Sequence, residues 1–152
     1  MEEQPADIQQ RRAASARLLA LSDWTEIAVL TESLIQQPHE ILRGPETGLV
    51  MVRGRMGSTG APFNLGEATV TRCSVKLVNG IEGHAYALGH NSELVRRMAL
   101  CDALLQDRQA DQSPLHRMME ALLQSLSEKR GQAAAKVATT KVDFFTVVRG
   151  DA

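Results

Sequence analysis

The chain has 152 residues, 43% of them apolar, which is enough apolar material for one compact domain. A formal net charge of −1 and a pI near 6.4 argue against a dedicated nucleic-acid binder, because such proteins usually carry a strong basic excess. No apolar run approaches the roughly 18 residues that span a bilayer, and the acidic N-terminal stretch lacks an uninterrupted apolar core, so we expect neither a membrane segment nor a signal peptide.

The first predicted elements are two helices. Apolar residues recur at near-helical spacing over Pro5–Leu21. Asp23 then has the position of a helix N-cap, and Glu26 has the capping-box position. The second helix begins with Trp24, which we interpret as a core anchor, and should end before Pro38.

The middle of the chain has the pattern of strands joined by turns, and nine of the eleven glycines lie in it. Asn79-Gly80 is typical of a two-residue type I′ turn, which predicts a hairpin around it. In the returning strand, small residues on one face permit the close approach of a helix. These residues are Gly83, Ala85 and Ala87. We predict four strands: His39–Arg43, Thr47–Met56, Glu67–Val78 and Ile81–Leu88.

Two more helices and a tail follow the strands. Asn91 or Ser92 caps the third helix, and Ser113-Pro114 starts the fourth, which we extend to Lys136. Residues 141–152 form an apolar run bracketed by charges, which is compatible with a strand, a helix end or a partner-binding tail. We favour an element that docks on a partner.

This order of elements predicts an α+β fold, with an antiparallel sheet of about four strands flanked by N-terminal and C-terminal helices. We expect residues 1–152 to form a single domain with four parts. These are a helical hairpin (1–37), the sheet (39–89), the helices (91–136) and the docking tail (141–152).

The glycine-rich loop from Arg53 to Asn64 is the main candidate binding site. Its backbone N–H groups, arginines and hydroxyls could hold phosphate or phosphonate oxygens, although its glycine spacing matches neither a dinucleotide fingerprint nor a P-loop. The alternative is a hairpin loop whose glycines only satisfy turn geometry. The candidate substrate- or partner-binding residues are Arg53, Arg55, Gly57, Thr59, Gly60, Asn64, Thr71 and Arg72.

Other polar residues give weaker signals. Glu46, Glu67 and Arg72 could meet at a strand end and do acid–base work, but solvated charges at a strand edge explain them better. The histidines have no recognised metal-ligand spacing, and we expect no metal site. They are His39, His84, His90 and His116. Cys73 and Cys101 lack metal-type spacing too, which indicates packed, free thiols in a reducing cytoplasm. No catalytic residue is predicted.

Four segments of the chain carry a family resemblance. They are Glu46–Val50, Arg55–Gly60, Gly66–Arg72 and Val142–Asp151. Together they strongly resemble the PhnG family, the G subunit of the bacterial carbon–phosphorus lyase core complex. The helix of Trp24, the Asn79-Gly80 hairpin and Asp102-Ala103-Leu104 also fall where that family has comparable features, so the resemblance spans nearly the whole chain.

The resemblance implies a companion subunit in organic phosphonate catabolism. With the H, I and L subunits it supports transfer of the ribose triphosphate moiety of MgATP to an alkylphosphonate, with release of adenine. This is the transferase reaction of alpha-D-ribose 1-methylphosphonate 5-triphosphate synthase. The resemblance also implies two copies in a symmetric cytoplasmic assembly with H, I and J subunits, with no nucleic acid and no membrane. MgATP is then a substrate of the complex, and we expect this chain alone to bind no cofactor and to be inactive.

The resemblance provides no catalytic residues to assign. We expect residues 53–64, with Thr71 and Arg72, to support the I subunit or its substrate entrance. We expect a second interface in the tail, because an exposed Phe-Phe pair is unfavourable in a monomer. Its residues are Asp143, Phe144, Phe145 and Arg149. Two alternatives stay open: a free-standing phosphate- or phosphonate-binding module that uses residues 53–64, and a self-sufficient enzyme.

Overall fold

A computed structural model describes residues 5–57, 59–109 and 111–139 of the chain. The fold is α+β, as predicted, with an antiparallel sheet in the middle of the sequence and helices before and after it. In chain order the elements are α1 (Pro5–Leu21), α2 (Trp24–Leu30), the 3-10 helix η1 (Leu34–Gln36), β1 (His39–Arg55), β2 (Pro62–Leu77), β3 (Glu82–Leu88), α3 (Ser92–Gln106) and α4 (Ser113–Thr139).

The sheet has three strands in the order β1-β2-β3, where four were predicted. The first two predicted strands are one strand, because β1 continues through Gly44 and Pro45. The pairing with β2 shifts between Arg43 and Glu46, so Gly44 and Pro45 lie in a bulge. Since β1 is an edge strand, a proline at this bulge is tolerated without ending the strand.

The hairpin between β2 and β3 is confirmed, but the predicted turn type is wrong. Gly80 N–H donates to the Leu77 carbonyl at 2.9 Å, and Gly80 alone in the described turn has a positive φ, of 90°. The loop therefore has three residues with a glycine in the left-handed conformation. Asn79 keeps an ordinary conformation because its amide bonds Asp107 at 2.7 Å and its side-chain oxygen accepts from Ile81 N–H.

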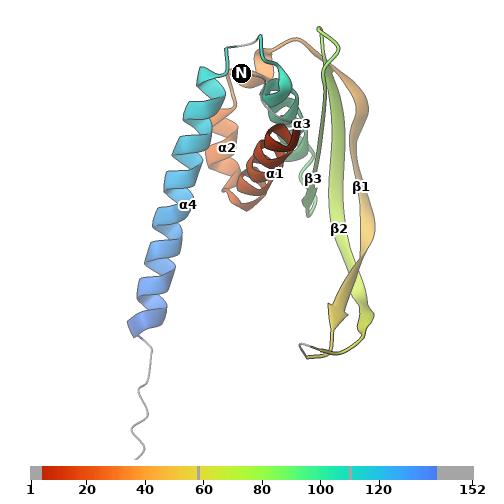
Figure 1. Cartoon of the computed structure of the whole chain (residues 1–152), viewed down its shortest axis with the longest axis vertical. Helices are drawn as coiled ribbons and strands as arrows, with labels where there is room; N and C mark the ends of the chain where they lie inside the picture. The colour runs from red at the N-terminus through yellow and green to blue at the C-terminus, as the bar shows by residue number, and fades with distance from the viewer. Residues whose placement is uncertain (1–4, 58, 110, 140–152) are drawn as a thin grey trace, which may run out of the picture.

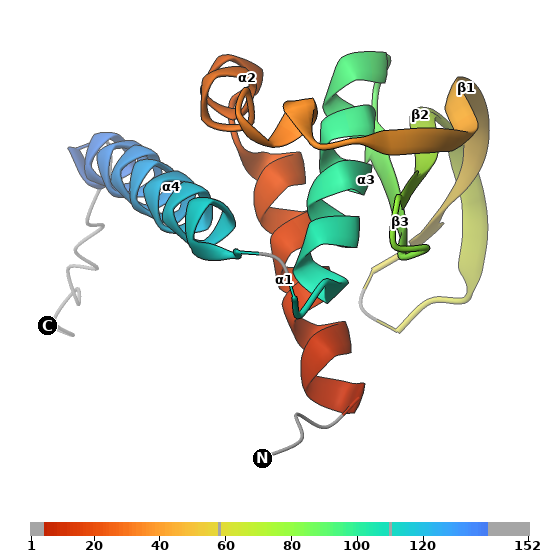
Figure 2. The same cartoon turned by 90° about the horizontal axis from the view of Figure 1, so that it is seen from above.

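The helices cover one face of the sheet at one end only (Figure 1). Seen from above, the sheet, α3, α1 and α4 follow one another across the molecule (Figure 2). Helix α3 lies directly on β2 and β3. At the contact, a Cβ on Gly83 would lie 2.1 Å from the Ala99 carbonyl oxygen, which confirms the close approach expected of this small-residue face.

One apolar core forms between the sheet, α3 and the other helices. Its fully or nearly buried residues include Leu19 of α1, Ile27 of α2, Val75 of β2, Leu100 of α3 and Leu122 of α4. Trp24 is half-buried and packs against this core, in partial agreement with its expected role as an anchor. Among the helices that the structure describes, none combines the length and apolarity needed to cross a membrane.

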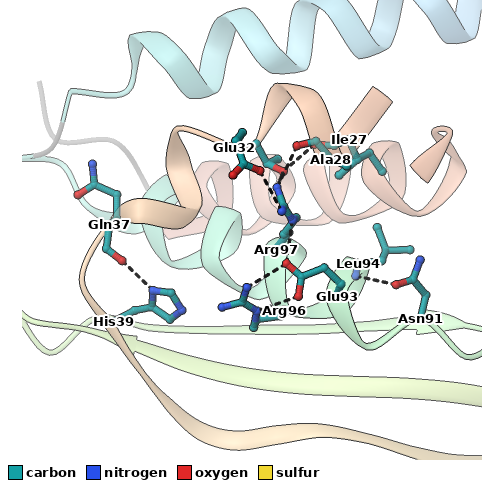
Figure 3. Close-up of polar contacts among 11 residues, drawn as sticks. Ile27, Ala28, Glu32, Gln37, His39, Asn91, Glu93, Leu94, Arg96 and Arg97 are labelled. Carbon is teal, nitrogen blue, oxygen red and sulfur yellow. Dashed lines mark hydrogen bonds and ion pairs between the residues drawn. The ribbon is translucent and has the colours of Figure 1, made fainter. Parts of the chain in front are cut away.

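Arg97 joins α3 to α2 (Figure 3). Its guanidinium donates to the Ala28 carbonyl at 3.0 Å and to the Thr31 hydroxyl at 2.8 Å, and pairs with Glu32 and Glu93. It also lies 5.7 Å from the centre of the Trp24 ring, within cation–π range. No sequence motif indicated this connection.

The predicted N-caps of α2 and α3 are confirmed, and α2 ends well before the limit that Pro38 sets. Asp23 accepts from Thr25 N–H and Asn91 from Leu94 N–H, as N-caps do. The predicted capping box is wrong, because Glu26 binds Ser125 and Lys129 of α4 instead. Helix α2 ends at Leu30, well before Pro38, where the Thr31 hydroxyl bonds the Ile27 carbonyl.

Candidate functional site

The distal half of the β1–β2 hairpin extends beyond β3 and beyond helices α1, α2 and α3, whereas α4 extends in the same direction on the side of the molecule away from the sheet (Figures 1 and 2). We call residues 47–57 and 59–69 the arm. Strand β3 pairs with β2 only as far as Val70, which lies opposite Leu88, and helices α1, α2 and α3 end at about the same level. The arm is therefore a two-stranded ribbon, and a ribbon of this kind is at best marginally stable when it is isolated in water.

Both faces of the arm expose apolar side chains. Leu49 and Met51, which alternate on the face that the helices cover elsewhere, are 64% and 52% exposed. Val50 and Val52, on the opposite face, are 43% and 37% exposed. Farther along the arm, Met56, Phe63 and Leu65 are also exposed. Exposed apolar surface of this kind is typical of protein or membrane interaction sites and of ligand-binding grooves.

Six of the predicted binding residues lie at the far end of the arm. They are Arg53, Arg55, Gly57, Thr59, Gly60 and Asn64. Gly57 has φ = +67°, and a Cβ on Gly60 would lie 2.1 Å from the Met56 carbonyl oxygen, so the turn itself requires both glycines. In the described part of the chain no carboxylate forms an ion pair with Arg53 or Arg55. A binding role for these residues stays a prediction.

Thr71 and Arg72 lie away from that end and point to opposite faces of β2. Thr71 is fully buried, and its hydroxyl donates to the Gly89 carbonyl at 2.8 Å and lies 3.0 Å from the Thr47 hydroxyl. The expectation that Thr71 helps to form a surface is therefore wrong. Arg72 is on the outer face of the sheet, opposite the helices.

A groove of about 820 Å³ is lined in part by Arg72. All three strands line it, together with Ala20 of α1, and the exposed side chains of Tyr86 and Leu88 form part of its wall. Sequence reasoning did not find this groove. The alternation of small and large residues along β3 was the available signal.

The polar end of the groove holds Glu46 between the guanidinium groups of Arg43 and Arg72. Desolvation acts to raise the pKa of Glu46, but the hydrogen bond from Arg72 and the charges of both arginines outweigh it, so the pKa is lowered. Glu67 lies opposite Met51 in the arm and does not join this group. A carboxylate held ionised in this way binds arginine well but is a poor general acid.

The histidines and cysteines take structural positions. His84 Nδ1 lies 2.9 Å from the Ser74 hydroxyl, and the described residues contain no group of three or more metal-ligating side chains. Cys73 and Cys101 are buried and unpaired. Burial raises the pKa of Cys101 to about 12 and also raises the pKa of Cys73, so neither thiol is activated as a nucleophile.

Comparison with known proteins identifies the family. The family model for "Phosphonate metabolism protein PhnG" matches residues 10–150. The chain belongs to the PhnG family. A relative from Rhizobium meliloti (strain 1021), "Alpha-D-ribose 1-methylphosphonate 5-triphosphate synthase subunit PhnG", is 42% identical over 149 residues, which cover 96% of this chain and 93% of the relative. The family resemblance inferred from the four sequence segments is thereby confirmed.

The PhnG match includes both the arm and the segment after α4. The arm is thus part of the region that the family shares. The predicted tail interface, Asp143, Phe144, Phe145 and Arg149, lies outside the described residues and stays a prediction.

Proposed function

We propose that this chain is a companion subunit of an alpha-D-ribose 1-methylphosphonate 5-triphosphate synthase complex and that it binds another subunit through the arm. The observation that carries the proposal is the exposed apolar surface on both faces of the arm. A monomer would leave this surface in water, whereas a subunit buries it when the complex forms. The name of the 42% identical relative supports the choice of complex.

In this proposal the complex transfers the ribose triphosphate moiety of MgATP to an alkylphosphonate in the cytoplasm and releases adenine. The H, I and L subunits act with this chain, and the bond-making groups belong to them. The arrangement of Glu46 supports this division of roles, because two arginines hold its carboxylate ionised rather than leave it available for proton transfer.

The test is co-expression of this chain with its candidate partner subunits, followed by size-exclusion chromatography and an adenine-release assay with MgATP and methylphosphonate. We expect wild-type chain to elute with the partners, and adenine release to require it. Leu49→Gln should weaken assembly at least about tenfold, because it places a polar group in the buried contact. Leu123→Gln is the matched control, since Leu123 is similarly exposed (56%) but lies on α4.

A wild-type chain that elutes as a monomer beside its partners would contradict the proposal. Saturable binding of inorganic phosphate or methylphosphonate by that monomer, lost in Arg53→Ala or Arg55→Ala, would instead favour a free-standing binding module. The absence of a carboxylate paired with either arginine in the described residues is the observation that keeps this second candidate in view.

A further inference from the structure

We propose that the free edge of β1, from Thr47 to Met51, pairs with an extended strand of a partner polypeptide, apolar in its middle and with a carboxylate beside Arg53. The arm then becomes an inner part of a sheet shared by two chains. This inference rests on the proposed function, because it states how the partner subunit is bound. Four observations carry it: backbone direction, unequal protection of the edges, apolar faces and charge.

The direction of the backbone groups follows from the β2–β3 hairpin. Gly89 N–H donates to the Thr69 carbonyl at 2.8 Å, and Leu77 N–H donates to the Ile81 carbonyl at 2.8 Å. Alternate residues of a strand point their backbone groups to opposite sides. The odd-numbered residues of β2 over this span therefore turn to β3, and the even-numbered residues turn to β1.

The same alternation identifies the free groups of β1. In the register of this hairpin, Gly48 pairs with Val70 and Val50 with Ala68, so these two β1 residues bond to β2. The backbone N–H and carbonyl groups of Thr47, Leu49 and Met51 consequently point away from the sheet. They form a row of unused donors and acceptors that fits a partner strand.

Parts of the other edges of the sheet are protected. On β3, the His84 N–H donates to Asp102 at 2.9 Å, and the Glu82 carbonyl accepts from Gln106 at 2.8 Å. On β2 beyond the end of β3, the edge carries the charge of Glu67. Between Thr47 and Val52, β1 has neither a charge nor a proline. Natural proteins use these devices to prevent strand pairing, so their absence here fits an edge that is paired in the assembly.

The apolar faces indicate how the shared sheet is covered. Leu49–Val52 is a continuous apolar run, which is the pattern of a strand covered on both faces rather than on one. In a strand that is covered on one face only, apolar residues would alternate with polar ones. A partner that adds a strand at this edge and packs side chains on both faces would match the exposure of all four residues.

Charge completes the description of the partner strand. At one end of the edge, Glu46 is already bound by Arg43 and Arg72. At the other end, Arg53 is exposed, and no described carboxylate pairs with it. The net charge along this edge is therefore positive, because two arginines surround the single carboxylate of Glu46 and Arg53 adds a further positive charge. Among these arginines Arg53 alone has no carboxylate partner in the described residues, which favours a partner strand with a carboxylate at that end.

The test compares Met51→Pro with Met51→Ala in complexes reconstituted with the partner subunits. Proline removes the N–H that faces the free edge, and proline is tolerated at an edge position of this kind. Both variants shorten the side chain, so their difference reports the backbone bond. We expect both to fold with similar melting curves and Met51→Ala to assemble, whereas Met51→Pro should assemble at least about tenfold more weakly, the effect of about 1.4 kcal/mol.

Amide hydrogen exchange of the wild-type chain provides a second measurement that needs no variant. The amides of Leu49 and Met51 should exchange at least about tenfold more slowly in the complex than in the free chain. The amide of Val78, in the β2–β3 turn, is the control and should change less. This measurement decides the matter if Met51→Pro does not fold.

The outcomes separate the two proposals. If wild-type chain does not join the partner subunits, the proposed function fails. If it joins them while Met51→Pro assembles like Met51→Ala, or while the Leu49 and Met51 amides exchange unchanged, only the strand pairing is overturned. Protection of these amides in a dimer of the free chain would make a second copy the occupant and overturn the choice of partner. Protection of these amides in the free monomer that is lost when residues 140–152 are removed would make that segment the occupant. This result would also overturn the choice of partner.

Discussion

The two halves of the β1–β2 hairpin use similar residues in different surroundings. In the covered half, β2 turns Cys73, Val75 and Leu77 into the core beneath α3. In the arm, β1 turns Leu49 and Met51 to the same side of the sheet and leaves them exposed. The apolar pattern of a strand therefore shows that something covers it, but not whether the cover belongs to the same chain.

The difference follows from the lengths of the elements. Helix α3 has 15 residues, and at about 1.5 Å each it is roughly 22 Å long. Strand β2 has 16 residues, and at about 3.3 Å each it is roughly 50 Å long. Helix α3 can thus cover only about seven residues of the strand. The rest of the hairpin extends past α3, the helix that lies on the sheet (Figure 1).

The largest expected contrast between the halves is at glycine. In the covered half, a Cβ on Gly83 would lie 2.1 Å from the Ala99 oxygen and 2.5 Å from the Ala103 nitrogen, and neither backbone atom can move without shifting α3. Gly83→Ala should lower the free energy of unfolding by about 3 kcal/mol. In the arm, a Cβ on Gly48 meets nothing within 4 Å, so Gly48→Ala should change it by less than about 0.5 kcal/mol. Urea unfolding measures both, and equal losses would contradict the contrast.

A smaller contrast is expected at valine. Val75 in the covered half is fully buried, and Val75→Ala should lower the free energy of unfolding by about 1.5 kcal/mol, since each buried methylene contributes about 0.8 kcal/mol. Val50 in the arm is 43% exposed in the free chain, and Val50→Ala should cost under about 0.5 kcal/mol there. Thermal unfolding of the free chain checks the pair. A Val50→Ala loss as large as that of Val75→Ala would mean that the arm is already covered.

The smallest effect is expected at Glu93 of α3, which forms ion pairs with Arg96 and Arg97. The hydrogen bond from Arg96 is the main cause that lowers the pKa of Glu93 below its ordinary value. Desolvation opposes this shift, and the hydrogen bond from Arg97 adds to it. Its stabilisation is therefore complete above the unfolded pKa of about 4.3 and is lost as the pH falls through the lower folded value. Because Glu93 is 40% exposed, the contribution should stay under about 1 kcal/mol. Urea midpoints measured from pH 7 to pH 3 should fall less steeply for Glu93→Gln than for wild type. Parallel curves would show that this carboxylate contributes nothing.

Local signals predicted most of the elements. Helical periodicity gave α1, α3 and α4, the side chains of Asp23 and Asn91 cap helices as expected, and alternation gave the β2–β3 hairpin. The errors have physical causes that a sequence pattern does not show. A bulge at an edge let β1 continue through Pro45, and the bond between Asn79 and Asp107 selected a different turn.

The candidate site was predicted less well, because residues 53–64 were grouped with Thr71 and Arg72 of the following strand as one surface. The structure separates its members: Arg53 and Arg55 lie at the end of the arm, Arg72 lies in the groove, and Thr71 is buried. The groove itself needs residues from three strands, and the Arg97 contacts need two helices that are far apart in sequence.

The sequence by itself determined the types of the elements, most of their ends and the family, because each depends on neighbouring residues or on a linear pattern. Only the tertiary structure decided which apolar residues are buried. Burial depends on how far a helix of fixed length reaches along a longer strand, and periodicity within the strand carries no information about that reach.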